Sequence, residues 1–383
     1  MIVTIASTPV FLNFTGKVLT RGIASHVSSK IFPSPVTRGI KHNQAFLKVH
    51  KNFQKSLFRQ TLTVAQNSVA GISPKASRYV GTWLICCSGM VVGSVILGGI
   101  TRQNADMTLE EFKWIWYMEY GHRMWGRAVG ATFLLPAIYF WRKKWFTKAM
   151  KSRVLIFGTL ILCQGLLGWY MVKSGLEEKP EPDGVARVSQ YRLAAHLGMA
   201  FVLYSLMLWS GLNHLLPPQS METTQKLLKF RRFAHGAKGL IFLTAFSGAF
   251  VAGIEAGLVY NSFPKMADRW IPSDIAAFSP LWRNITENPT TTQFNHRILG
   301  ETVFCAVTGL WWYSRKLPLS PRARLAVNCM FAMALIQVSL GIATLLMQVP
   351  KPLAASHQSG ALALLSTAIW LTHELRILKM IPK

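Results

Sequence analysis

Residues 119–141 read EYGHRMWGRAVGATFLLPAIYFW, a cluster of ionisable side chains followed by an apolar run. About 20 apolar residues cross the hydrocarbon of a bilayer, and a charge at the centre of such a helix costs roughly 2.5–3.5 kcal/mol. Ionisable groups inside a membrane are therefore candidates for function, although the cost falls near the interface. The candidates in this stretch are Glu119, His122, Arg123 and Arg127.

The composition is typical of a polytopic membrane protein. Of 383 residues, 51% are hydrophobic and only 15% are charged, and the mean hydropathy is +0.28, values that soluble chains rarely combine. The net charge is +27, and residues 1–78 hold eleven Lys or Arg before the first acidic residue, Asp106. Such an acid-free leader, assigned to residues 1–75, predicts mitochondrial targeting. A secretory signal is the competing interpretation, and nucleic-acid binding is not expected.

Eight stretches are long and apolar enough to span a bilayer. The connections between them alternate between basic segments, such as WRKKWFTKAMKSR, and segments that mix acids with bases. The positive-inside rule then puts the basic loops and both termini on one side, which is the matrix side of the mitochondrial inner membrane if the leader is mitochondrial. The predicted spans are 79–100, 122–141, 153–173, 190–213, 234–255, 293–314, 324–349 and 353–375.

The chain contains an internal repeat. HRMWG at 122–126 matches HRILG at 296–300, QGLLG at 164–168 matches QVSLG at 337–341, and LAAH at 193–196 resembles LAASH at 353–357. Three matches in the same order indicate two parallel four-helix units. The predicted fold is therefore an all-α polytopic membrane protein with eight transmembrane helices in two tandem four-helix bundles. The bundles are assigned to 76–215 and 234–383, with a basic matrix linker at 216–233.

Four histidines are predicted at one depth. His122, His196, His296 and His357 each fall within the first two turns of an even-numbered span, near the outer face, and each half contributes two. One histidine in an apolar helix is more often a satisfied polar group than a ligand, but paired histidines on facing helices can hold one haem iron axially. Zinc fits less well, because a structural site needs four ligands. The residues predict two haem sites.

The two halves differ in charge around the first histidine. Arg127 follows His122 by five residues, where the second half has Glu301, and Glu119 precedes His122 by three residues, where the second half has Gln293. Glu119 has two interpretations at this point: an ion pair with Arg123 at i+4, or a catalytic or electrostatic role.

Several motifs resemble the haem A synthase family of cytochrome c oxidase assembly proteins. The resemblance extends over residues 79–376 and rests on these motifs: GGITR at 98–102, EYGHRMWGR at 119–127, VAGIEAGLVYNSFPKM at 251–266, ENPTTTQFNHRILGE at 287–301 and TLLMQVPKPLAASHQSGALAL at 344–364. It implies an enzyme that oxidises the C8 methyl of haem O to a formyl group by successive hydroxylations. It also implies substrate haem O at His122 and His196, a haem b cofactor at His296 and His357, and a catalytic Glu119.

Three arginines have two interpretations each. Arg123, Arg127 and Arg297 could pair with haem propionates or anchor helix ends at the interface. The resemblance implies a ferredoxin electron donor, with haem O synthase and a second copy of the chain as further partners beside the lipid bilayer. The segment after GGITR is shorter than the outer loop of family members. Two alternatives to the enzyme therefore stay open: a non-catalytic haem carrier or assembly scaffold, and a two-haem electron-transfer cytochrome.

Overall fold

The structure, a computed structural model, describes residues 72–100, 108–177 and 188–378. Most of the predicted leader lies outside these residues. The described part of the chain forms helices and no strand, which confirms the all-α class. The long helices are α2 (Pro74–Ile100), α3 (Leu109–Arg142), α4 (Lys148–Glu177), α5 (Gln190–Leu215), α6 (Gln225–Gly253), α7 (Pro289–Ser314), α8 (Pro321–Leu346) and α9 (Lys351–Glu374); short 3₁₀ helices are η1 (Ala256–Leu258), η2 (Leu281–Ile285) and η3 (Leu375–Ile377).

Helix α3 begins much earlier than predicted. The Thr108 hydroxyl accepts a hydrogen bond from the Glu111 backbone N–H at 3.3 Å, and the Glu111 carboxylate accepts one from the Thr108 N–H at 2.9 Å. This reciprocal capping box satisfies two N–H groups at the helix start. The helix therefore has 34 residues, and the predicted start at residue 122 was wrong. His122 is the fourteenth residue of α3, not a residue of its first two turns.

Five of the described helices are long and apolar enough to cross a membrane. The qualifying ranges are Pro74–Gly99, Lys148–Gly175, Gln190–Leu215, Gln225–Gly253 and Pro321–Leu346. By this measure α3, α7 and α9 do not qualify, and these three helices carry His122, His296 and His357. Polar residues near their N-terminal ends lower their mean hydropathy. A multi-pass helical membrane protein is supported, and the count of eight spans stays a prediction.

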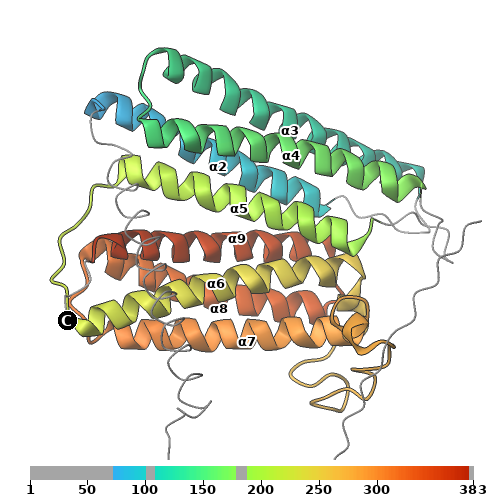
Figure 1. Cartoon of the computed structure of the whole chain (residues 1–383). Helices are drawn as coiled ribbons and strands as arrows, with labels where there is room; N and C mark the ends of the chain where they lie inside the picture. The colour runs from blue at the N-terminus through green and yellow to red at the C-terminus, as the bar shows by residue number, and fades with distance from the viewer. Residues whose placement is uncertain (1–71, 101–107, 178–187, 379–383) are drawn as a thin grey trace, which may run out of the picture. The chain divides into compact units, whose positions relative to one another are not determined.

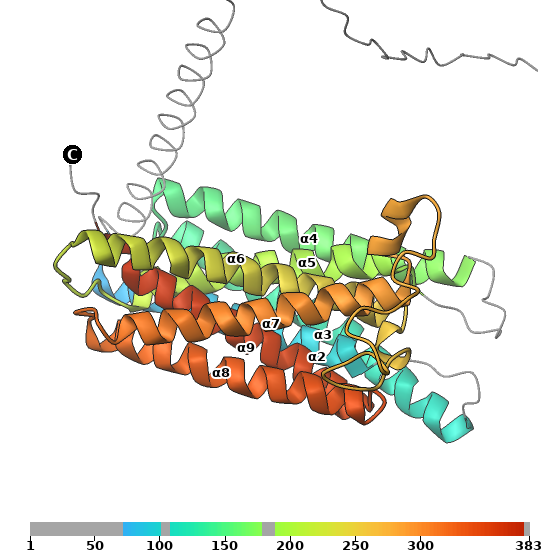
Figure 2. The ribbon, with the colours of Figure 1, turned by 90° about the horizontal axis from the view of Figure 1, so that it is seen from below.

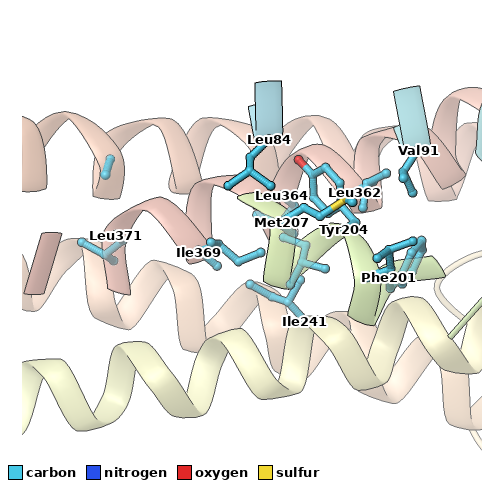
Figure 3. Close-up of a cluster of buried hydrophobic side chains, with 14 of the residues drawn as sticks. Leu84, Val91, Phe201, Tyr204, Met207, Ile241, Leu362, Leu364, Ile369 and Leu371 are labelled. Carbon is cyan, nitrogen blue, oxygen red and sulfur yellow. The ribbon is translucent and has the colours of Figure 1, made fainter. Parts of the chain in front are cut away.

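The two predicted halves meet along α2, α5, α6 and α9. Figure 1 shows α2–α5 on one side of this contact and α6–α9 on the other, and Figure 2 shows the same helices running in a nearly common direction. Leu84 of α2, Met207 of α5, Ile241 of α6 and Leu364 of α9 lie in one buried cluster between them (Figure 3). The described helices all belong to one compact unit, so the predicted boundaries between bundles stay a prediction.

Polar contacts join the halves at several levels, and near the start of α5 the Tyr191 hydroxyl donates to the Glu287 carboxylate at 2.8 Å. Within the core, the Tyr204 hydroxyl of α5 and the Ser366 hydroxyl of α9 are 2.6 Å apart. At the C-terminal ends of these helices, Arg376 donates to the Leu216 carbonyl at 2.9 Å. Arg322 of α8 donates to the Pro217 carbonyl and pairs with the buried Glu374 carboxylate at 3.2 Å. The segment that follows α5 is thus held by arginines of the second half.

Candidate functional site

Each of the four histidines packs against a glycine of the preceding long helix. The pairs are His122 with Gly98 of α2, His196 with Gly168 of α4, His296 with Gly248 of α6 and His357 with Gly341 of α8. A Cβ atom added to these glycines would lie 3.2, 3.0, 3.3 and 2.9 Å, respectively, from Cε1 of the facing ring. These separations are tight, so glycine is what lets each ring lie flush against its neighbouring helix. The repeat predicted from the sequence is present as a repeated contact.

The histidines also lie at a similar distance from the C-terminal ends of their helices. Between 17 and 20 residues separate each histidine from the end of its helix, which at 1.5 Å per residue is about 26–30 Å. This distance is close to the roughly 30 Å hydrocarbon thickness of a bilayer. Each histidine thus lies at a similar distance from the C-terminal end of its helix even though α3 begins early, and the common depth in a membrane stays a prediction.

The second-half histidines face each other at a distance that suits one metal between them. The ring centroids of His296 and His357 are 6.3 Å apart, with the ring planes at 86°. A metal bound at about 2.0–2.1 Å by one nitrogen of each ring would separate the centroids by about 6 Å. The described residues contain no group of three or more His, Cys, Asp or Glu side chains placed to hold a metal. The donor set here is therefore two imidazoles, the set that axial ligation of a haem uses.

The first-half histidines, His122 and His196, resemble His357 in the surroundings of their rings. The Nδ1 atoms of both rings, like that of His357, are buried and have no hydrogen-bond partner. His296 differs, because its Nδ1 lies 2.7 Å from the Ser247 hydroxyl. The four rings thus share the contact with a glycine. They differ at Nδ1, where His296 alone of the four has a serine hydroxyl beside it.

Two glutamines hold the second histidine of each half in the same way. The Gln164 amide of α4 donates to the His196 carbonyl at 2.8 Å, and the Gln337 amide of α8 donates to the His357 carbonyl at 2.8 Å. These glutamines open the matched motifs QGLLG and QVSLG, whose last residues are the facing glycines Gly168 and Gly341. The sequence comparison found the motifs, but it assigned no role to their glutamines or glycines.

Glu119 forms the ion pair that its spacing allows. Its carboxylate accepts a hydrogen bond from the Arg123 guanidinium, and the two side chains are 29% and 53% exposed. At the matched positions of α7, the side-chain amide oxygen of Gln293 accepts a hydrogen bond from the Arg297 guanidinium at 3.2 Å. The same i, i+4 contact is therefore charged on both sides in the first half and has a neutral acceptor in the second. Arg127 is exposed, and its guanidinium lies 3.6 Å from the Met124 sulfur.

Residues 254–288 fold over the N-terminal end of α7 and engage Arg297. Arg297 donates to the Tyr260 carbonyl at 2.9 Å, and Gln293, which is 3% exposed, donates to the carbonyls of Ala256 and Tyr260. Asp274 anchors the segment by accepting from the hydroxyls of Thr290 at 2.6 Å and Tyr260 at 3.0 Å. The bond from Thr290 is the main cause that lowers the pKa of Asp274. Arg297 is thus committed to backbone carbonyls of this segment.

Comparisons with known proteins agree with this architecture. A sequence model of the family described as "Cytochrome oxidase assembly protein" matches residues 103–369. Heme A synthase COX15 of Bos taurus is 54% identical over 356 residues, covering 82% of this chain and 86% of the relative. The Arabidopsis thaliana protein of the same name is 35% identical and covers 97% and 94%. The heme A synthase of Nitrosospira multiformis is 38% identical and covers 83% and 99%.

The alignment lengths bear on the segment after GGITR. The alignment with the Bos taurus protein spans 356 positions, whereas 82% of the 383 residues of this chain is about 314 residues. About 42 aligned positions of that relative therefore have no counterpart here. The family match begins at residue 103, directly after this motif. The shorter first outer segment expected from the sequence stays a prediction.

Proposed function

The chain belongs to the cytochrome oxidase assembly protein family whose matched members are named heme A synthases, and we propose that it is a haem A synthase. In this proposal it oxidises the C8 methyl of haem O to a formyl group by successive hydroxylations. The observation that carries the proposal is the pairing of His296 with His357, whose 6.3 Å separation fits one iron. The repeated glycine–histidine contacts extend this argument to the first half.

The second half is proposed to hold the resident haem b. His296 and His357 would hold it, each kept against its glycine and the second held by Gln337 through its backbone carbonyl. When bound, haem b supplies one-electron transfer. The chain's own contribution is a fixed ligand pair on α7 and α9, inside a bundle that keeps the site apolar.

The first half is proposed to bind haem O as substrate through His122 and His196. Oxidising a methyl carbon beside a porphyrin builds positive charge, which a carboxylate held nearby would stabilise. Glu119 lies one turn before His122 and its charge acts on that ring. The ion pair with Arg123 keeps this carboxylate oriented. Glu119 therefore has a structural partner and is also the proposed catalytic group.

The three arginines are candidates for binding haem propionates. Arg123 and Arg127 are exposed on α3 near His122, and they remain candidates for haem propionates. Arg297 is a further candidate: its guanidinium donates to the Tyr260 carbonyl, and its buried Nε has no hydrogen-bond partner.

Location and partners follow from the family and the charge pattern. The proposed location is the mitochondrial inner membrane, with both termini in the matrix and the haem sites toward the intermembrane space. The proposed electron donor is a ferredoxin, and haem O synthase and a second copy of the chain are proposed partners.

The deciding experiment is conversion of haem O by the purified chain with a reductant. Haem b is expected to copurify, and hydroxylated and formyl products are expected by chromatography. A matched chain with the first outer segment lengthened to that of a relative tests whether this segment limits turnover. Bound haem without oxidised product in either chain would favour the carrier or scaffold. Electron transfer by both haems without product would favour the two-haem cytochrome.

A further inference from the structure

We infer that Ser247 is a positioning residue that orients the His296 ring and fixes its tautomer. This inference rests on the proposed function, since it concerns a ligand to the resident haem. It assigns a role to a hydroxyl that neither the sequence repeat nor the family resemblance singled out.

The hydrogen bonds around Ser247 define the direction of donation. Its hydroxyl donates to the Thr244 carbonyl at 2.8 Å, one turn earlier in α6. A serine hydroxyl has a single hydrogen, so toward the His296 Nδ1 atom, 2.7 Å away, the oxygen acts as acceptor. Nδ1 must then carry the proton. In a neutral imidazole the other nitrogen, Nε2, keeps the free lone pair that a metal requires.

The other three histidines lack a side-chain hydroxyl at this position, although backbone groups of Ser94 and Gln337 lie near the rings of His122 and His357. The residue directly before each facing glycine is Leu97 in α2, Leu167 in α4 and Leu340 in α8, whereas in α6 it is Ser247. The Nδ1 atoms of His122, His196 and His357 are buried without a hydrogen-bond partner. The serine therefore replaces a leucine at the one position of this repeated contact from which a side chain reaches the ring.

The consequence for a bound haem follows from the hydrogen bond at the nitrogen of His296 that does not bind the metal. An acceptor on the far nitrogen fixes the ring and raises the basicity of the ligating nitrogen, and losing such a partner typically costs about 10–100-fold in metal affinity. A more basic ligand favours ferric over ferrous iron. The His296 site is thus suited to retain a cofactor with a lowered midpoint potential, and the serine hydroxyl is the feature that the His122 site lacks.

The test compares Ser247→Ala with Ser247→Thr in the full-length chain, purified with its copurified haem. Transfer of haem b to an excess of apomyoglobin gives the dissociation rate, and redox titration of the Soret band gives the midpoint potential. S247A is expected to release haem about 10–100-fold faster and to have a raised potential, whereas S247T keeps a hydroxyl and behaves as wild type. A tenfold preferential loss of ferric affinity corresponds to about 59 mV for this one-electron couple.

Controls separate this inference from the ligand assignment. Ser88→Ala removes a buried hydroxyl that also donates to a backbone carbonyl of its own helix, but in α2, and should change neither measurement. If S247A does not fold, Ser247→Cys provides the same test with a weak acceptor of similar size. If His296→Ala loses haem but S247A has an unchanged haem release rate and an unchanged midpoint potential, the inference is overturned. Where S247C replaces S247A, the same result in S247C overturns it. Retention of haem in His296→Ala would instead overturn the ligand proposal.

Discussion

The two halves of the molecule share one framework and differ in the residues that surround it. In both, a histidine lies against a glycine of the preceding helix, and a glutamine holds the second histidine through its carbonyl. The differences lie around the first histidine. The α3 copy has the Glu119–Arg123 ion pair beside it, whereas the α7 copy has Arg297 bonded to the neutral side-chain amide of Gln293 and a serine behind the ring.

In the proposed function, these differences distinguish the second half, which holds a haem, from the first half, which acts on one. The second half adds supports: Ser247 behind His296, and the segment 254–288 fastened over α7 through Gln293 and Arg297. The first half has instead a partly exposed carboxylate at the position where the second half has an amide. A duplicated site can thus diverge by changing two or three side chains while its backbone contacts remain.

Removing a proposed haem ligand should give the largest effect on haem content, and the result can contradict the proposed difference between the halves. His296→Ala or His357→Ala is expected to remove most of the resident haem, because each deletes one of two axial ligands. His122→Ala should retain that haem but lose conversion of haem O. Absorbance of the purified variants and product analysis check both statements. Equal haem loss in the His122 and His296 variants would show that the halves do not differ as proposed.

Replacing Glu119 by glutamine, the residue at the matched position 293 of the second half, tests whether this one side chain accounts for the proposed difference between the halves. Glu119→Gln is expected to lower turnover by about 10²–10³-fold, the usual effect of removing one transition-state electrostatic contact. Its stability should change by less than about 1 kcal/mol, because partly exposed ion pairs contribute little. The measurements are haem O conversion and thermal unfolding.

The control is Glu110→Gln, which breaks the exposed pair with Lys113 on the same helix. It should alter neither quantity. Normal turnover in the Glu119 variant would leave this residue with the ion pair alone.

Filling the glycine contacts should give smaller, graded effects. Gly341→Ala puts a Cβ atom 2.9 Å from the His357 ring, and Gly248→Ala puts one 3.3 Å from His296. We expect a several-fold loss of haem affinity in the first and a weaker loss in the second, because the tighter contact forces the larger ring displacement. Haem titration of each variant is the measurement.

A glycine on the far side of α6 provides the control. Gly239 lies nine residues before Gly248, and no atom lies within 4 Å of a Cβ added there. Nine residues at 100° each place it on the opposite face of the helix. Gly239→Ala should leave haem affinity unchanged, and a loss equal to that of Gly341→Ala would assign the effect to helix propensity instead of ring contact.

The sequence predicted the helices and the four histidines better than the contacts that hold the histidines in place. Apolar runs and repeated motifs identified the helices and the four histidines, because both depend on local spacing. The early start of α3 was missed although Thr108 and Glu111 have capping-box spacing, because the span was defined by hydrophobicity alone. The contacts of Gln337, Ser247 and Arg297 depend on which helix and loop face them in space, so their roles needed the structure.

The polar contacts between the halves have a consequence for assembly. Lipid tails are as apolar as leucine, so in a bilayer the buried cluster between α5 and α9 provides little hydrophobic driving force for association. Orientation must then come from directional contacts: the Tyr204–Ser366 hydrogen bond in the core and the bonds from Arg376 and Arg322 to the carbonyls of Leu216 and Pro217. The mutual alignment of the two bundles is therefore specified mainly by a few hydroxyl and guanidinium groups.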